Sequence, residues 1–73
     1  MSNSTVFLRR DFAEQQVTKH GGITPWGAAL GVDKGTVSRQ INRKAEASGR
    51  FIAAVLTKCA VPFPDAFDVV ESD

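Results

Sequence analysis

The stretch ITPWGAALGVDKGTVSRQIN, which runs from Ile23 to Asn42, decides the fold. A short helix can begin near Pro25, because proline suits the first turn, and Gly31 ends it, because glycine adopts the left-handed conformation without strain. Asp33 is then a good N-cap for a second helix, expected over Lys34 to Arg43. The sequence therefore predicts two short helices joined by a turn of about three residues that begins at a glycine.

The same stretch predicts how its two helices pack. Gly27 lies on the face toward the second helix, so its missing side chain allows a close crossing. Val32 would fill the angle at the turn. Residues four apart share a helix face. We therefore expect a common apolar core made by Trp26, Leu30, Val37 and Ile41.

Two longer helices are expected before and after this pair. In residues 8–19, four-residue steps from Leu8 fall on Phe12 and Gln16, with Ala13 and Val17 beside them. Gly21-Gly22 ends that helix. A polar link over residues 44–49 leads to the strongest amphipathic pattern of the chain. This pattern is made by Phe51, Ile52, Val55, Leu56 and Cys59.

The chain beyond Pro62 is expected to form a last short helix that starts at Pro64 or Asp65. Phe67 and Val70 would face the core from it, with Phe63 packing from the preceding loop. Apart from a few residues near Val6, no segment alternates as a half-buried strand does. We therefore predict an all-α fold, a compact bundle of about five short helices containing a helix-turn-helix. It would be a single domain over residues 1–73, with flexible ends at 1–6 and 71–73.

The composition limits the class of protein. The 73 residues suffice for one domain with a marginal core, and 42% hydrophobic residues argue against wholesale disorder. No apolar stretch approaches the roughly 18 residues of a membrane span. The polar start lacks the apolar stretch of a signal peptide, so we expect a cytoplasmic protein. The single cysteine, Cys59, excludes an internal disulfide and a multi-cysteine zinc site.

No pattern in the chain indicates an enzyme. There is no phosphate-binding Walker loop, no supported pair of carboxylates and no nucleophile beside a base. His20 is expected to act at a helix C-terminus, Cys59 to fill the apolar stripe and Trp26 to anchor the core. We therefore expect no catalytic residue, no metal, no cofactor and no small-molecule ligand.

The net charge of +1 hides an uneven distribution. Residues 1–33 are balanced, residues 34–58 carry six basic side chains against Glu46 alone, and residues 59–73 carry four acidic side chains and no basic one. The expected helix over residues 34–43 is rich in Thr, Ser, Arg, Gln and Asn. Side chains that donate and accept hydrogen bonds on a positive background suit the reading of bases. The alternative explanation is an ordinary solvated helix face.

The segment ALGVDKGTVSRQIN resembles the helix-turn-helix of lambda-repressor-like and Cro-like phage regulators. It has the small residue, the glycine, the apolar residue, the polar start and the Thr-Val-Ser-Arg run of that motif. The likeness runs from about Leu8 to Val70, and the RFIAAVL run is similar to small regulators of actinobacterial phages. Two positions depart from the pattern: Gly27 replaces a common alanine, and the apolar contact falls on Ile41 instead of Gln40.

The resemblance implies a sequence-specific transcriptional regulator that reads double-stranded DNA through the major groove. The expected base-reading residues are Lys34, Gly35, Thr36, Ser38 and Arg39. Arg39 is the first candidate, because a guanidinium can donate two parallel hydrogen bonds to guanine. Thr36 could equally be a buried residue at the helix start. The expected phosphate contacts are Thr24, which can also cap its helix, Asn42, Arg43 and Lys44.

The resemblance also implies a repressor or Cro-type protein in a bacterial host cell, associated with the nucleoid when it is bound to DNA. One such module reads about 4 to 6 base pairs, so we expect a homodimer on a pseudo-palindromic operator. The dimer would form in solution or only on DNA, through residues 62–70 or the fourth helix. The acidic tail would stay away from the DNA because of its charge.

Two other classes of function stay open. One is a protein-interaction module, such as an antirepressor or an antitoxin-like partner. The other is an architectural DNA binder of the excisionase type. Such binders usually add a two-stranded wing, and the sequence has no hairpin pattern that would predict one.

Overall fold

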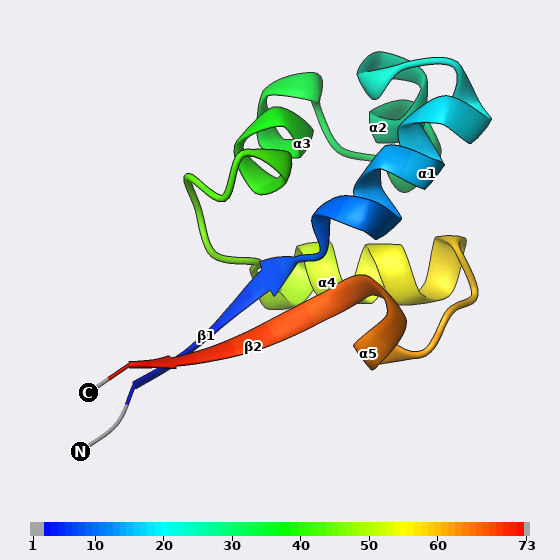
Figure 1. The fold of residues 1–73 in the computed structure, drawn as a ribbon. Helices are drawn as coiled ribbons and strands as arrows, with labels where there is room; N and C mark the ends of the chain where they lie inside the picture. Colours follow the sequence, from blue (N-terminus) through cyan, green and yellow to red (C-terminus); the bar gives the residue numbers. More distant parts are fainter. Residues whose placement is uncertain (1–2, 73) are drawn as a thin grey trace.

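The computed structural model describes residues 3–72, which form five helices and one two-stranded antiparallel ribbon (Figure 1). The mostly helical character that the sequence predicts is confirmed. The all-α class is wrong, because the two ends of the chain pair as strands. The elements in chain order are β1 (Asn3–Leu8), α1 (Arg10–His20), α2 (Ile23–Leu30), α3 (Lys34–Ile41), α4 (Gly49–Lys58), α5 (Phe63–Ala66) and β2 (Phe67–Ser72).

The core lies where α1, α2, α3 and α4 meet, and Trp26 is its largest fully buried side chain. The ring of Phe12 meets Trp26 edge-on, with 6.3 Å between the ring centroids. From α4, Phe51 and Val55 are buried as the amphipathic pattern predicts, whereas Ile52, Leu56 and Cys59 are only partly buried. Burial of a large apolar side chain contributes about 1.5 to 3 kcal/mol, so these few residues supply much of the stability of so small a core.

The turn between α2 and α3 has the geometry that its sequence predicts. Gly31 ends α2 in the left-handed conformation, with φ of 79°. Asp33 caps α3, because its Oδ1 accepts a hydrogen bond from the backbone N–H of Thr36 at 2.8 Å. A Cβ atom on Gly27 would lie only 2.9 Å from the carbonyl oxygen of Val32. The close crossing therefore depends on this glycine.

Helix α2 begins earlier than expected. Gly22, not Thr24, is its N-cap, and the N–H of Trp26 donates to the carbonyl of Gly22 at 3.2 Å. Gly22 has φ of 145°, a conformation that suits glycine, so the chain can turn directly from α1 into α2. Thr24 consequently lies inside the first turn of α2 and does not cap it.

Helix α3 ends at Ile41, two residues earlier than expected, because Arg43 adopts a left-handed conformation with φ of 55°. Its inward face also differs from the prediction. Gln40 is buried at 5% exposure, whereas Ile41 is partly exposed. Gln40 fits this position because its Nε2 donates to the carbonyl oxygen of Glu46 at 3.0 Å, which satisfies part of the buried amide.

The chain after α5 forms a strand, not the helix that was expected to continue to Val70. Leu8 pairs with Phe67 where the ribbon meets the helices, and both side chains are buried, at 1% and 2% exposure. Phe67 therefore faces the core as predicted. Val70 does not, since it lies on the projecting part of β2 and is 41% exposed.

The ribbon also replaces the flexible ends that the sequence predicts. Residues 3–6 and 71–72 lie in paired strands, and residues 1–2 and 73 lie outside the described part of the chain. Figure 1 shows the ribbon projecting away from the helices, with the start of β1 and the end of β2 side by side at its far end. Two backbone hydrogen bonds of 2.8 Å fix its base: the N–H of Ala47 donates to the carbonyl oxygen of Val6, and the N–H of Arg9 donates to that of Ala66.

Candidate nucleic-acid interface

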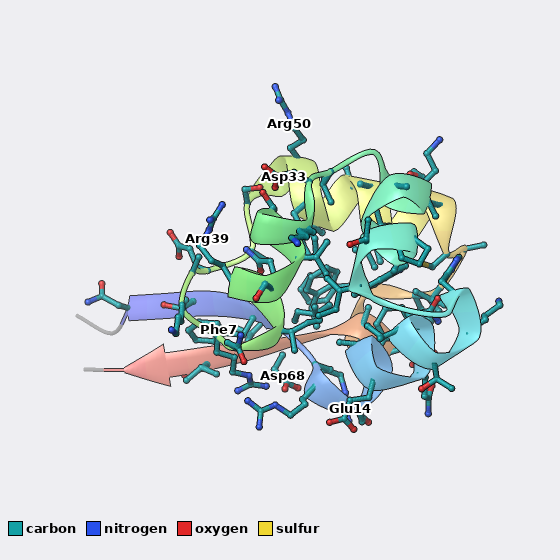
Figure 2. All side chains as sticks on the ribbon, turned by 90° about the horizontal axis from the view of Figure 1, so that it is seen from above. Phe7, Glu14, Asp33, Arg39, Arg50 and Asp68 are labelled. Atoms are coloured by element: carbon teal, nitrogen blue, oxygen red, sulfur yellow. The ribbon has the colours of Figure 1, made fainter. Side chains whose placement is uncertain are left out.

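Helix α3 has one buried and one exposed face. Val37 and Gln40 point inward, at 0% and 5% exposure. Lys34 and Arg39 are exposed, and Figure 2 shows Arg39 projecting from α3 away from the packed core. The outward surface of this short helix therefore carries hydrogen-bonding and basic side chains and no carboxylate.

The start of α3 and the start of α2 together form an open groove. Thr24 contributes from α2, and Lys34, Gly35 and Ser38 contribute from α3. The groove has a volume of about 610 Å³, and the remaining lining comes from Gly21, Gly22, Ile23 and Pro25. One phosphate candidate and three base-reading candidates thus share one concave surface, although they lie as many as 14 positions apart in the sequence.

Arg39 lies beside this groove and not in it. Its guanidinium Nη2 donates to Oγ1 of Thr36 at 3.5 Å, and a Cβ atom on Gly35 would lie 3.5 Å from its Nη1. The side chain therefore runs back along α3 toward the N-terminal end. The distance from that Cβ atom to Nη1 is an ordinary van der Waals contact, and Thr36 is partly buried beside the Arg39 side chain.

The N-terminal end of α3 carries a negative charge on its cap. The pKa of the Asp33 carboxyl is lowered from its usual value, first by hydrogen bonding with the Thr36 side chain and then by the backbone N–H of Thr36. The positive charge of Arg39 contributes to the same shift. Asp33 therefore stays ionised at neutral pH and fixes the first turn of α3 next to the base-reading candidates.

The three phosphate candidates after α3 differ in what they already bind. Asn42 donates from Nδ2 to the carbonyl oxygen of Ser38 at 3.0 Å and lies 3.4 Å from its Oγ, so it caps the end of α3. Lys44 is exposed, and the structure gives its ammonium group no ion pair among the described residues. Arg43 donates from Nη2 to Oδ2 of Asp68 at 2.8 Å. Within the described residues, Lys44 therefore has no ion pair to break, whereas the Arg43 guanidinium already binds a carboxylate.

Sequence reasoning missed Asp68 and Phe7 as neighbours of this surface. Both lie on the ribbon, where they pair across the two strands, and Figure 2 shows them on the ribbon below α3. The acidic tail was expected to stay away from the DNA-facing surface, but β2 brings Asp68 to the residue that follows the α3 cap. No pattern within either segment indicates this, because the contact joins residues 25 positions apart.

The other residues that the sequence singled out lie apart from this surface. Trp26 is fully buried, and its Nε1 has no hydrogen-bond partner in the described chain. Cys59 is partly buried, with its sulfur 3.8 Å from Oε1 of Gln16. Within residues 3–72 no three metal-binding side chains gather, and no helix has the length and apolar character needed to cross a membrane.

Comparison with known proteins identifies no relative. No family model matches the chain, and neither the search of curated proteins nor the search of solved structures gave a significant match. The residues of α2, α3 and the ribbon are therefore the basis for a proposed function.

Proposed function

We propose that the protein is a sequence-specific regulator of transcription that binds double-stranded DNA through a helix-turn-helix made by α2 and α3. The observation that carries the proposal is the two-sided character of α3. One face is buried against α2, and the other presents hydrogen-bonding and basic side chains without a carboxylate. Helices of this kind fit the major groove, where base edges present a distinct pattern of donors and acceptors.

In this proposal, the base-reading residues are Lys34, Gly35, Thr36, Ser38 and Arg39, and the phosphate contacts are Thr24, Asn42 and Lys44. The shared groove of Thr24, Lys34 and Ser38 supports the assignment, since a DNA backbone and the adjacent base edges can be reached from one concave surface. Arg43 is left out, because its guanidinium already binds Asp68. Gly35 takes part only by letting the DNA approach closely.

Two copies would bind a pseudo-palindromic operator, with their reading helices about 34 Å apart. Self-association is supported by two exposed apolar residues on β2, Val69 at 54% and Val70 at 41% exposure. Both lie within residues 62–70, one of the two segments in which the sequence places the pairing. Phe63 and Phe67 of the same segment stack on each other, with 5.4 Å between their ring centroids, and Phe67 is buried in the core. The proposed protein acts as a repressor or Cro-type regulator by occupying its operator.

A salt series tests this proposal. Affinity is measured for an enriched duplex and for random duplexes, with wild type, Arg39→Ala and the control Lys58→Ala. Lys58 is an exposed cation at the end of α4, outside the motif. Arg39→Ala should weaken binding to the enriched duplex by about 1 to 3 kcal/mol and binding to random duplexes much less. Lys58→Ala should leave the preference between duplexes unchanged. Binding that is insensitive to salt and to Arg39→Ala would exclude the proposal.

A protein-interaction module is the second candidate, and the free edge of β2 favours it. Exposed strand edges with apolar side chains bind extended segments of other proteins. Such a module would keep its partner after Arg39→Ala and lose it after a change on β2. An architectural DNA binder has less support. The ribbon is not a DNA-binding wing, since its described residues include two carboxylates, Asp68 and Glu71, and no lysine or arginine.

A further inference from the structure

Asp68 on β2 binds two arginines from other parts of the chain. Its Oδ2 accepts a hydrogen bond from Nη2 of Arg43 at 2.8 Å, and its Oδ1 accepts one from Nη1 of Arg9 at 3.5 Å. Arg43 follows the cap of α3 and Arg9 precedes α1, so one carboxylate connects the ribbon to both helices. The three side chains are 37% to 39% exposed, so the two ion pairs lie at the surface of the protein.

Arg43 is also held by the other strand of the ribbon. Its Cζ lies 5.5 Å from the ring centroid of Phe7, which is the direct cross-strand partner of Asp68. The guanidinium therefore packs against the ribbon through charge and through the ring face. The left-handed backbone of Arg43, with φ of 55°, is uncommon for a residue with a side chain. Contacts with the ribbon compensate for that conformation and fix where the guanidinium points.

Arg43 lies between Asn42 and Lys44, the two phosphate contacts proposed at the end of α3. An arginine in such a place would ordinarily neutralise a phosphate and release counterions. Here a carboxylate already accepts the charge-assisted hydrogen bond and offsets the positive charge. We propose that Asp68 masks Arg43 from the DNA. The ribbon thereby sets how many phosphates the end of α3 neutralises, an inference that rests on the proposed DNA-binding function.

The first test compares two neighbouring cations, Arg43 and Lys44, by the slope of log affinity against log salt concentration. Each phosphate contact contributes about 0.9 to this slope. Lys44→Ala should reduce the slope by about that amount. Arg43→Ala should leave the slope unchanged, because the masked guanidinium neutralises no phosphate. An Arg43→Ala slope that falls as far as that of Lys44→Ala would overturn the proposal.

The second test removes the mask. Asp68→Asn keeps the size of the side chain but loses its charge, so the freed Arg43 should strengthen binding at low salt and increase the slope by about 0.9. Glu71→Gln is the matched control. It removes the same charge from an exposed position of the same strand, where no ion pair is present in the described chain. The gain from Asp68→Asn should disappear in an Arg43→Ala background.

The outcomes separate the two proposals. If the wild type shows no salt-dependent DNA binding, the proposed function fails and the mask fails with it. If the wild type binds but Asp68→Asn and Glu71→Gln strengthen binding equally, long-range charge explains the effect and only the mask is wrong. If Asp68→Asn weakens binding without changing the slope, Asp68 positions α3 and masks nothing. Circular dichroism establishes folding, and the Arg43→Ala comparison remains decisive if Asp68→Asn does not fold.

Discussion

Gly27 shows how one residue sets the crossing of α2 and α3. A Cβ atom at this position would lie 2.9 Å from the carbonyl oxygen of Val32 and 3.2 Å from Cγ2 of Val37. The first of these neighbours is backbone in the turn itself, so it cannot rotate away. The glycine gives up helix propensity in exchange for this close approach. Its sequence position predicted that role, and the distance confirms it.

We predict that Gly27→Ala destabilises the protein in spite of the better helix propensity of alanine. The propensity gain is at most about 1 kcal/mol, whereas forcing extra atoms into a packed contact costs about 1 to 3 kcal/mol. Urea unfolding measures the difference in free energy. Gly49→Ala is the control, since its added Cβ would meet nothing within 4 Å, and it should be neutral or stabilising. A Gly27→Ala protein as stable as Gly49→Ala would contradict the crossing argument.

Gln40 is buried where the sequence pattern predicted that Ile41 would be. Its amide is buried with one hydrogen bond, from Nε2 to the Glu46 carbonyl at 3.0 Å, while its Oε1 has no partner within the described chain. Ile41 is more hydrophobic than Gln40, but it is only partly buried. Gln40 can be buried in place of Ile41 because the carbonyl oxygen of Glu46, in the loop after α3, accepts a hydrogen bond from its amide.

Gln40→Glu tests this arrangement. The substitution replaces the donor by a carboxylate next to a carbonyl oxygen, so the protein should lose about 2 to 4 kcal/mol at neutral pH, read from urea midpoints. The loss should shrink in acid, where a protonated carboxyl can donate to the Glu46 carbonyl. Gln15→Glu, the same change at an exposed position of α1, should cost little. Equal losses for the two variants would show that Gln40 is not buried as described.

At the scale of elements, α3 depends on its cap and its packing more than on propensity. Thr36, Val37 and Ser38 are poor residues for a helix interior. Asp33 supplies the missing hydrogen bond at the N-terminus through Thr36, and Val37 is fully buried. A helix of eight residues is too short to be stable alone. Its position relative to α2 is therefore fixed by the cap, the turn and the core together.

The lowered pKa of Asp33 predicts an acid-sensitive α3. Because the folded-state pKa is depressed, the ionised cap stabilises the fold fully above the unfolded pKa of about 3.9, and this contribution is lost as the pH falls through the folded-state value. Asp33→Asn still caps but cannot titrate. It should lose less stability than the wild type between about pH 5 and about pH 3, measured by urea unfolding. Asp11, whose pKa is lowered by its hydrogen bond with Arg9, contributes equally to both proteins. If the wild type and Asp33→Asn lose the same stability in acid, titration of Asp33 does not cause the acid sensitivity.

At the scale of the whole molecule, the ribbon gives the chain an edge that helices alone would not have. Val6 directs its carbonyl to Ala47, away from β2, so its pair with Val69 is one that exchanges no hydrogen bonds across the ribbon. The N–H and C=O of Val69 consequently point outward at the free edge of β2. A projecting two-stranded ribbon is marginal by itself, and pairing with a second copy would extend it.

Val69→Pro should prevent this pairing and leave the fold intact. Proline removes an outward N–H that the ribbon itself does not use, and prolines are tolerated on strand edges for that reason. Sedimentation equilibrium, with and without the operator duplex, measures the association. Val69→Ile, which keeps the N–H and the apolar side chain, should behave as the wild type does. If the Val69→Pro protein associates as strongly as the Val69→Ile protein, the dimer contact does not lie at the edge of β2.

Features that depend on near neighbours in the chain could be predicted from the sequence alone. The glycine stop of α2, the Asp33 cap, the close crossing at Gly27 and the amphipathic face of α4 all follow from spacing and local conformation. These features also place Lys34, Ser38 and Arg39 on one exposed surface of α3. The base-reading hypothesis therefore follows from the sequence alone.

Contacts between residues far apart in the chain became visible in the folded structure and not in the sequence. The pairing of Leu8 with Phe67 and the binding of Arg43 by Asp68 each bring together segments whose own patterns are weak. The burial of Gln40 depends in addition on the path of the loop after α3, whose Glu46 carbonyl accepts its hydrogen bond. Strand pairing between the two ends is not encoded by alternation in a six-residue segment, because its hydrogen bonds come from the backbone and its stability from burial at one end. The same ribbon, which the sequence pattern could not predict, supplies the carboxylate that binds Arg43, while Lys44 has no ion pair within the described residues.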